Sequence, residues 1–145
     1  MAEQFDLIID ADDSTLSAEF RLFDAAGVQV AANTTRFADI LPSTQRGLFD
    51  LHGYLRVYHD KPRHAAEAAA IGVCIAEQVL GKAIFEALWQ SQAERTLRIQ
   101  LPGAAQPGNR LAALLASVPW EIARPAPGQP TLAERNLLVR LVHRA

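Results

Sequence analysis

The sequence is poor in the features that identify several classes of protein. Among its 145 residues there is one cysteine, Cys74, so the chain cannot form an internal disulfide. A lone thiol fits a reducing compartment, and a cytoplasmic protein is therefore expected. Aromatic residues make up 7% of the chain, and the formal net charge is -2. Because no basic run is interleaved with aromatic residues, no nucleic-acid partner is expected.

A long uninterrupted apolar run is also missing. A membrane-spanning helix needs about 20 predominantly apolar residues. The densest apolar stretch, residues 65–88, contains Glu67, Glu77, Gln78, Lys82 and Glu86. The amino terminus, MAEQFDLIIDADD, is acidic and has neither the basic nor the apolar region of a secretory signal. We therefore expect no membrane association and no secretory signal.

Apolar residues are nevertheless half of the chain, which is enough for one hydrophobic core in a single domain, residues 1–145. Apolar and polar residues alternate with period two over Phe5–Asp10, Leu16–Phe23 and Val28–Ala31, which predicts three strands. The segments between them, DADDS and DAAG, are rich in turn residues. A three-stranded antiparallel meander is therefore predicted.

After Pro42 the apolar spacing becomes three or four residues, which indicates helices. One helix is predicted to begin at Ser43 and to end before Pro62. A second long helix is predicted from Arg63 to Gln92, and Gly81 marks a place where it bends or splits.

Further strands are predicted in the last third of the chain. Alternation over Leu97–Leu101 indicates one strand, and the apolar run Leu137–Val142 indicates another. A short helix over Arg110–Ser117 lies between them, and Thr131 and Glu134 have the spacing of a capping box. The predicted fold class is therefore α/β, with an N-terminal meander, two long helices and then further strands.

Two carboxylates with Asp-x-Asp spacing follow the first predicted strand, in FDLIIDADDSTL. This arrangement resembles the opening of haloacid-dehalogenase-type phosphatases, which would make Asp10 the nucleophile and Asp12 the general acid around a magnesium ion. Such enzymes also need a later lysine and a later acidic pair at strand ends. Lys61 and Lys82 are the only lysines, and no further acidic pair follows a later predicted strand. We interpret the stretch as a solvated turn and keep the magnesium-dependent phosphatase as the less favoured alternative.

A histidine followed by glycine, His52-Gly53, and a downstream cysteine, Cys74, are the residue types of a caspase-like peptidase. His52 lies within a helical pattern, however, and Cys74 lies in an apolar helix, where burial makes a thiol a poor nucleophile. Structural roles are predicted for both. The histidines do not have zinc-ligand spacing, so neither a metal nor a cofactor is predicted.

The segment VPWEIARP combines a helix-breaking residue, a large aromatic residue and an acid. Pro119 ends the preceding helix and makes the residue before it extended. Trp120 is expected to fill the core, while Glu121 needs backbone N–H groups or an arginine if it turns inward. The candidate arginines are Arg135 and Arg140. We interpret Pro119, Trp120, Glu121 and Arg140 as a structural corner.

A Val-Pro-Trp-Glu corner followed by a loop and a Leu-Val-Arg strand resembles the N-terminal half of CHAT domains. These are caspase-like cysteine peptidase domains of clan CD, often fused to helical repeats. Upstream, GVCIAEQVLGKAIFEALW is similar to the long helix that precedes the family's Leu-Arg-Ile strand, and FDLIIDADDSTLSAEFRLFDAAG is similar to its opening meander. The resemblance covers roughly Phe5 to Val142.

In that family both the catalytic histidine, in a His-Gly segment, and the catalytic cysteine follow the Leu-Val-Arg strand. The sequence stops at Ala145, so no catalytic residue of the family is carried over to this chain. The resemblance implies an N-terminal structural or regulatory part of a cysteine peptidase, inactive alone. Its expected partners are the remainder of the parent protein or another protein, with a homodimer through exposed sheet edges as a further prospect. The alternative is a stand-alone protein-interaction module.

Overall fold

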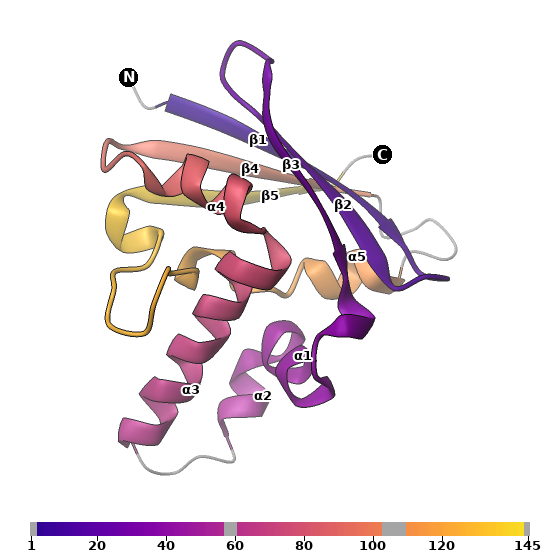
Figure 1. The fold of residues 1–145 in the computed structure, drawn as a ribbon, viewed down its shortest axis with the longest axis vertical. Helices are drawn as coiled ribbons and strands as arrows, with labels where there is room; N and C mark the ends of the chain where they lie inside the picture. Colours follow the sequence, from indigo (N-terminus) through magenta and orange to yellow (C-terminus); the bar gives the residue numbers. More distant parts are fainter. Residues whose placement is uncertain (1–2, 57–60, 103–109, 144–145) are drawn as a thin grey trace.

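The computed structural model describes residues 3–56, 61–102 and 110–143. Five strands form one sheet in the order β3-β2-β1-β4-β5 (Figure 1). The first three strands pair antiparallel, β4 is parallel to β1, and β5 is parallel to β4. Their bounds are Glu3–Asp12 for β1, Ser17–Phe23 for β2, Gln29–Arg36 for β3, Arg95–Leu101 for β4 and Leu137–His143 for β5. The predicted α/β class and the N-terminal meander are confirmed.

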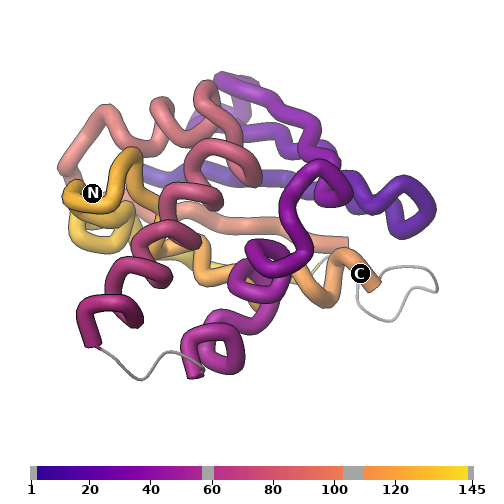
Figure 2. The backbone as a smooth tube through the Cα atoms, turned by 60° about the horizontal axis from the view of Figure 1, so that its bottom comes forward, coloured from indigo at the N-terminus to yellow at the C-terminus, as the bar shows by residue number. Residues whose placement is uncertain are grey.

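The helices gather on one side of the sheet, as the two views in Figures 1 and 2 show. They are α1 (Pro42–Phe49), α2 (Leu51–Leu55), α3 (Lys61–Cys74), the π-helix η2 (Ile75–Val79), α4 (Lys82–Trp89) and α5 (Arg110–Leu115). Short 3-10 turns are η1 (Phe37–Asp39), η3 (Trp120–Ile122) and η4 (Ala133–Arg135).

The core lies between this helical layer and one face of the sheet. Alternate residues of the central strands are fully buried there, including Leu7 on β1, Phe20 on β2 and Ile99 on β4. The residues between them, such as Asp6 and Arg98, stay partly accessible on the opposite face. We call this opposite side of the sheet the open face. One-sided alternation of this kind is what period-two sequences produce.

Strand β3 extends to Arg36, well beyond the predicted end at Ala31. Its second half is polar, yet two of its side chains face the helices. Thr35 Oγ1 donates to the carbonyl of Val79 at 2.7 Å, and Asn33 Nδ2 reaches the same carbonyl at 3.4 Å. Polar residues therefore occupy inward positions because a helix end offers them acceptors, and alternation of hydrophobicity does not reveal this.

Each of the two predicted long helices is interrupted. Asp50 breaks the first (φ -150°, ψ 69°), and its carboxylate then accepts the N–H of Gly53 at the start of α2. The second turns into a π-helix and breaks at Gly81, whose φ of +82° suits glycine. Within the described residues, no single helix has both the length and the apolar character to cross a membrane. Lys61–Val79 and Lys82–Trp89 meet that test only when joined across their 115° bend.

Candidate functional site

Strand β5 forms one edge of the sheet, and its outer edge pairs with no other strand in the described ranges. Its apolar side chains are unusually accessible: Leu138 is 62% exposed, Leu141 41% and Val142 37%. Parallel strands are usually covered on both faces. Beyond its first residue, Leu137, which is buried, β5 thus carries apolar surface on both faces.

A local chain of contacts fixes where β5 begins. Thr131 and Glu134 form the predicted capping box: Thr131 N donates to Glu134 Oε1, and Glu134 N donates to Thr131 Oγ1, each at 3.1 Å. The segment ends at Asn136, which is left-handed (φ 65°) and directs the chain into the strand. Asn136 Nδ2 donates to the Gln92 carbonyl at 2.8 Å, which ties this turn to the segment before β4.

A buried arginine holds the beginnings of β4 and β5 together. Arg95 is only 1% exposed, and its guanidinium donates to three carbonyls: Ala93 at 2.8 Å, Arg135 at 2.5 Å and Leu88. Burial, together with the nearby Arg135 cation, lowers the pKa of Arg95. Arg135 in turn donates to the Trp89 carbonyl and lies 4.1 Å from the centre of the Trp89 ring. Carbonyls at the end of α4 therefore substitute for a counter-ion.

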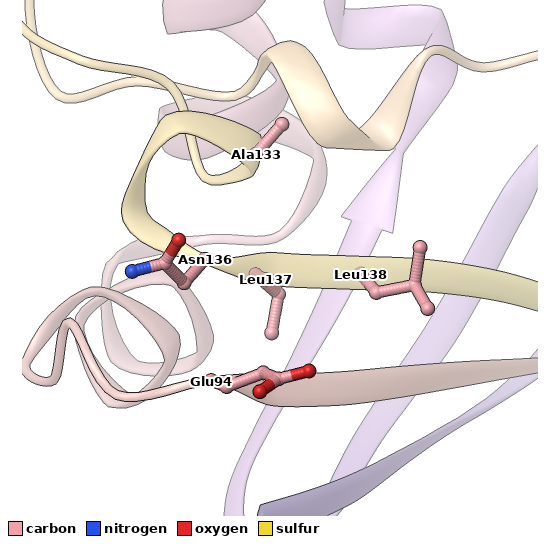
Figure 3. A pocket seen from close by; sticks show the side chains of 5 residues that line it. All are labelled: Glu94, Ala133, Asn136, Leu137 and Leu138. Carbon is pink, nitrogen blue, oxygen red and sulfur yellow. The ribbon is translucent and has the colours of Figure 1, made fainter. Parts of the chain in front are cut away.

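An open recess of about 580 Å³ lies at the beginning of β5 (Figure 3). It is lined by Glu94, Ala133, Asn136, Leu137 and Leu138. Figure 3 places Glu94 at the start of β4, across from the two leucines of β5. The unpaired edge is therefore continuous with a hollow that has room for a further side chain.

Beside β5 the open face of the sheet is charged. Arg98 Nε pairs with Asp6 Oδ1 at 2.7 Å, and Gln100 Nε2 donates to the same oxygen at 3.2 Å. Arg140 stands next to Arg98 in the register between β4 and β5 and is exposed. In the part of the chain that the structure describes, Arg140 has no acidic partner. The outer strand therefore presents an unneutralised cation.

The predicted corner is divided between core and solvent. Trp120 is 1% exposed and packs edge-on against Phe20, with ring centroids 6.3 Å apart. Glu121 is exposed and forms no ion pair within the described residues, so the inward orientation that would require an arginine does not occur. Arg140 lies on β5. After Pro119, backbone hydrogen bonds hold the corner, including one from Leu132 N to the Ala123 carbonyl at 2.9 Å.

Asp10 and Asp12 both project from the end of β1 and already have partners. Arg21 Nη2 lies 3.0 Å from Asp10 Oδ2. Asp12 Oδ1 accepts the hydroxyl of Ser14 at 2.7 Å and its backbone N–H at 2.9 Å, and these hydrogen bonds lower the Asp12 pKa. Across the described ranges, no group of three or more His, Cys, Asp or Glu side chains is placed to hold a metal ion.

A role for the neighbouring residue Asp13 was not predicted. Its carboxylate accepts the backbone N–H groups of Arg110 at 2.8 Å and Leu111 at 2.7 Å, at the beginning of α5. These N–H groups have no partner within their own helix, and a carboxylate is the preferred acceptor there. The residues are almost a hundred positions apart, so local sequence carries no signal of this contact.

The two residues that suggested cysteine chemistry lie in separate helices. His52 is exposed in α2, whereas Cys74 is buried at the end of α3. Burial, with a smaller contribution from Glu77, raises the pKa of the Cys74 thiol to about 11. A thiol of this kind remains protonated at neutral pH and is a poor nucleophile.

Comparison of the chain with protein-family models, with curated proteins and with solved structures finds no match. The candidate site is therefore identified from the structure of this chain alone. It is the β5 edge: the outer side of Leu137–His143 together with the recess at its beginning. Because it offers backbone hydrogen-bonding groups and apolar side chains, such a surface is suited to pairing with another extended segment.

Proposed function

We propose that this chain is the N-terminal, non-catalytic part of a CHAT-like, caspase-like cysteine peptidase of the cytoplasm. Its task is to supply the first strands of a sheet that the remainder of the parent domain continues at β5. The observation that carries this proposal is the exposure of Leu138, Leu141 and Val142 on a parallel strand at the edge of the sheet.

The opposite edge strand, β3, is less suited than β5 to pair with another strand. Strand β3 has a polar second half, a register irregularity opposite Leu22 and Phe23, and packing contacts with α4. Irregular and polar edges resist pairing with other chains, whereas a regular apolar edge promotes it. Although Val30 on β3 is also exposed, β5 is therefore the better suited of the two described edge strands to be continued by another strand.

The state of Cys74 supports an inactive scaffold. Its thiol is buried with a raised pKa, and His52 lies in a different helix. A peptidase of this class needs a thiolate near an imidazole. In the proposal, both groups belong to the remainder of the parent domain.

The decisive experiment reads the codons that follow Ala145 and compares two products, residues 1–145 and the longer chain, on peptide substrates. We expect a His-Gly segment and then an Ala-Cys segment in the added residues. Only the longer product should cleave, and Cys74→Ala should leave its rate unchanged. Replacing the cysteine of the Ala-Cys segment should abolish cleavage.

Two outcomes would overturn the proposal. One is cleavage by residues 1–145 alone that Cys74→Ala abolishes. The other is a reading frame without either segment, which would favour a stand-alone interaction module. A concentration-independent melting transition, with a single monomeric species in light scattering, would accompany that second outcome.

A further inference from the structure

The outer edge of β5 carries one charge in the middle of apolar residues. Arg140 is the central residue of Leu137–His143 and is exposed. Leu138 and Val142 lie two positions away on the same face, while Val139 and Leu141 lie on the other face. Any strand that pairs with β5 must therefore place one of its own side chains directly beside this guanidinium.

The neighbourhood of Arg140 favours an anion at that position. Arg98, which stands beside Arg140, is a second cation, and the nearby acid Asp6 is already paired with Arg98. Among the described residues, Arg140 is therefore left without an acidic partner. Opposed side chains on neighbouring strands have Cβ atoms about 4.5–5.5 Å apart, close enough for a carboxylate to meet a guanidinium. A basic residue there would be repelled, and an apolar residue would cover the charge without pairing it.

We propose that the segment that adds to β5 has an acidic residue opposite Arg140, flanked by two apolar residues on each side. It is an extended strand of the form apolar-apolar-acid-apolar-apolar. The inner pair of apolar residues faces Val139 and Leu141, and the outer pair faces Leu138 and Val142. This inference rests on the proposed function for the origin of the segment, which is the remainder of the parent domain.

A second copy of the chain is a poor occupant. Full antiparallel pairing of two β5 strands, centred on Arg140, places this residue opposite its own symmetry mate. Like charges directly opposite each other are destabilising. A shift of register avoids this contact but pairs only Leu137–Leu141 or Val139–His143 of each copy and leaves both cations unpaired. The position of Arg140 therefore favours a partner strand with a sequence different from that of β5.

The experiment attaches the segment covalently, so that a weak intrinsic affinity cannot hide the effect. A Gly/Ser linker after Ala145 is followed by Val-Leu-Glu-Leu-Val in one version and Val-Leu-Lys-Leu-Val in the other. Each tail is combined with the native chain, with Arg140→Glu, and with Arg36→Glu. Arg36 is an exposed arginine on the opposite edge strand, β3, so it provides a control with the same change of charge.

In the native chain, we expect the glutamate tail to raise the melting temperature above that of the lysine tail by roughly 1–4 °C. In Arg140→Glu the order should reverse, and Arg36→Glu should leave the original order intact. Because Arg140 is exposed, its replacement should not prevent folding, and the variant without a tail verifies this. Equal effects of the two tails, an unchanged order in Arg140→Glu, or no stabilisation by either tail would overturn the inference.

Failure of the inference and failure of the proposed function can be told apart. A charge-dependent tail effect without catalytic segments after Ala145 would leave the edge chemistry intact and remove the peptidase proposal. Catalytic segments together with tails that do not discriminate would do the reverse.

Discussion

Gly72 on α3 lies against Ile122, the last residue of the η3 turn that contains Trp120. The approach is so close that a Cβ at position 72 would stand 2.4 Å from the Ile122 carbonyl oxygen. Backbone cannot yield as a flexible side chain can, and Arg124 N donates to the Gly72 carbonyl at 3.3 Å in the same contact. We expect Gly72→Ala to lower the free energy of unfolding by about 1–3 kcal/mol, measured by urea denaturation. The loss is notable because alanine is intrinsically the better helix former.

The control for this prediction is Gly128→Ala, where an added Cβ meets nothing within 4 Å. Its effect on the free energy of unfolding should remain within about 0.5 kcal/mol. If Gly72→Ala were as well tolerated as Gly128→Ala, α3 would not pack closely against the backbone of Ile122.

Trp120 should stabilise the fold by filling volume in the core and not by a hydrogen bond from its indole nitrogen. The indole Nε1 is buried, and no hydrogen-bond partner is found for it among the described residues. Trp120→Phe removes this unsatisfied donor and keeps most of the contact with Phe20, so it should cost less than about 1.5 kcal/mol. Trp120→Ala should cost about 3–5 kcal/mol because it leaves a cavity. Equal losses in the two variants, measured by thermal or urea unfolding, would contradict this division.

Replacing Arg95 should lower the free energy of unfolding more than replacing most other polar residues. Its guanidinium serves the carbonyls of Ala93, Leu88 and Arg135, and its replacement leaves buried acceptors without donors. We expect Arg95→Met and Arg95→Lys each to lower the free energy of unfolding by at least about 2 kcal/mol, since a lysine cannot reproduce the planar donor set. Arg36→Met, at an exposed position, is the matched control and should be nearly neutral. A neutral Arg95→Met would show that water replaces these bonds.

The features that sequence could predict are those with local causes. The meander follows from period-two alternation, and the capping box of Thr131 and Glu134 follows from residue spacing. Contacts between distant segments left no such trace. In the sequence, Arg95 is a polar residue at the start of a strand, which does not predict burial. Its burial is favourable because the fold brings the carbonyls of Leu88, at the end of α4, and of Arg135 within hydrogen-bonding distance.

The candidate site shows the same limit. Leu137–Val142 was predicted as an apolar strand, which is correct in type and begins at the observed residue. An apolar run, however, predicts burial, and the exposure of Leu138 arises because β5 is the outermost strand of the sheet. Strand order depends on which segments pair across the whole chain, and a single sequence does not specify it.

Cys74 makes the stability of the protein depend on alkaline pH. Burial raises the pKa of its thiol from 9.0 to about 11. Well below pH 9.0 the folded and unfolded chains both keep the proton, so this group leaves the free energy of unfolding unchanged. Between pH 9.0 and about 11 the unfolded chain loses the proton first, and stability must fall as the pH rises.

Urea denaturation across this interval should therefore give a steeper loss of stability in the native chain than in Cys74→Ala, although the variant starts from a lower value because it lacks the buried sulfur. The same burial predicts that a thiol-specific disulfide reagent at pH 8 labels the folded protein slowly and the urea-unfolded protein at the rate of a simple thiol. Equal slopes, together with rapid labelling of the folded chain, would mean that the end of α3 opens readily and that the sulfur is accessible to a substrate.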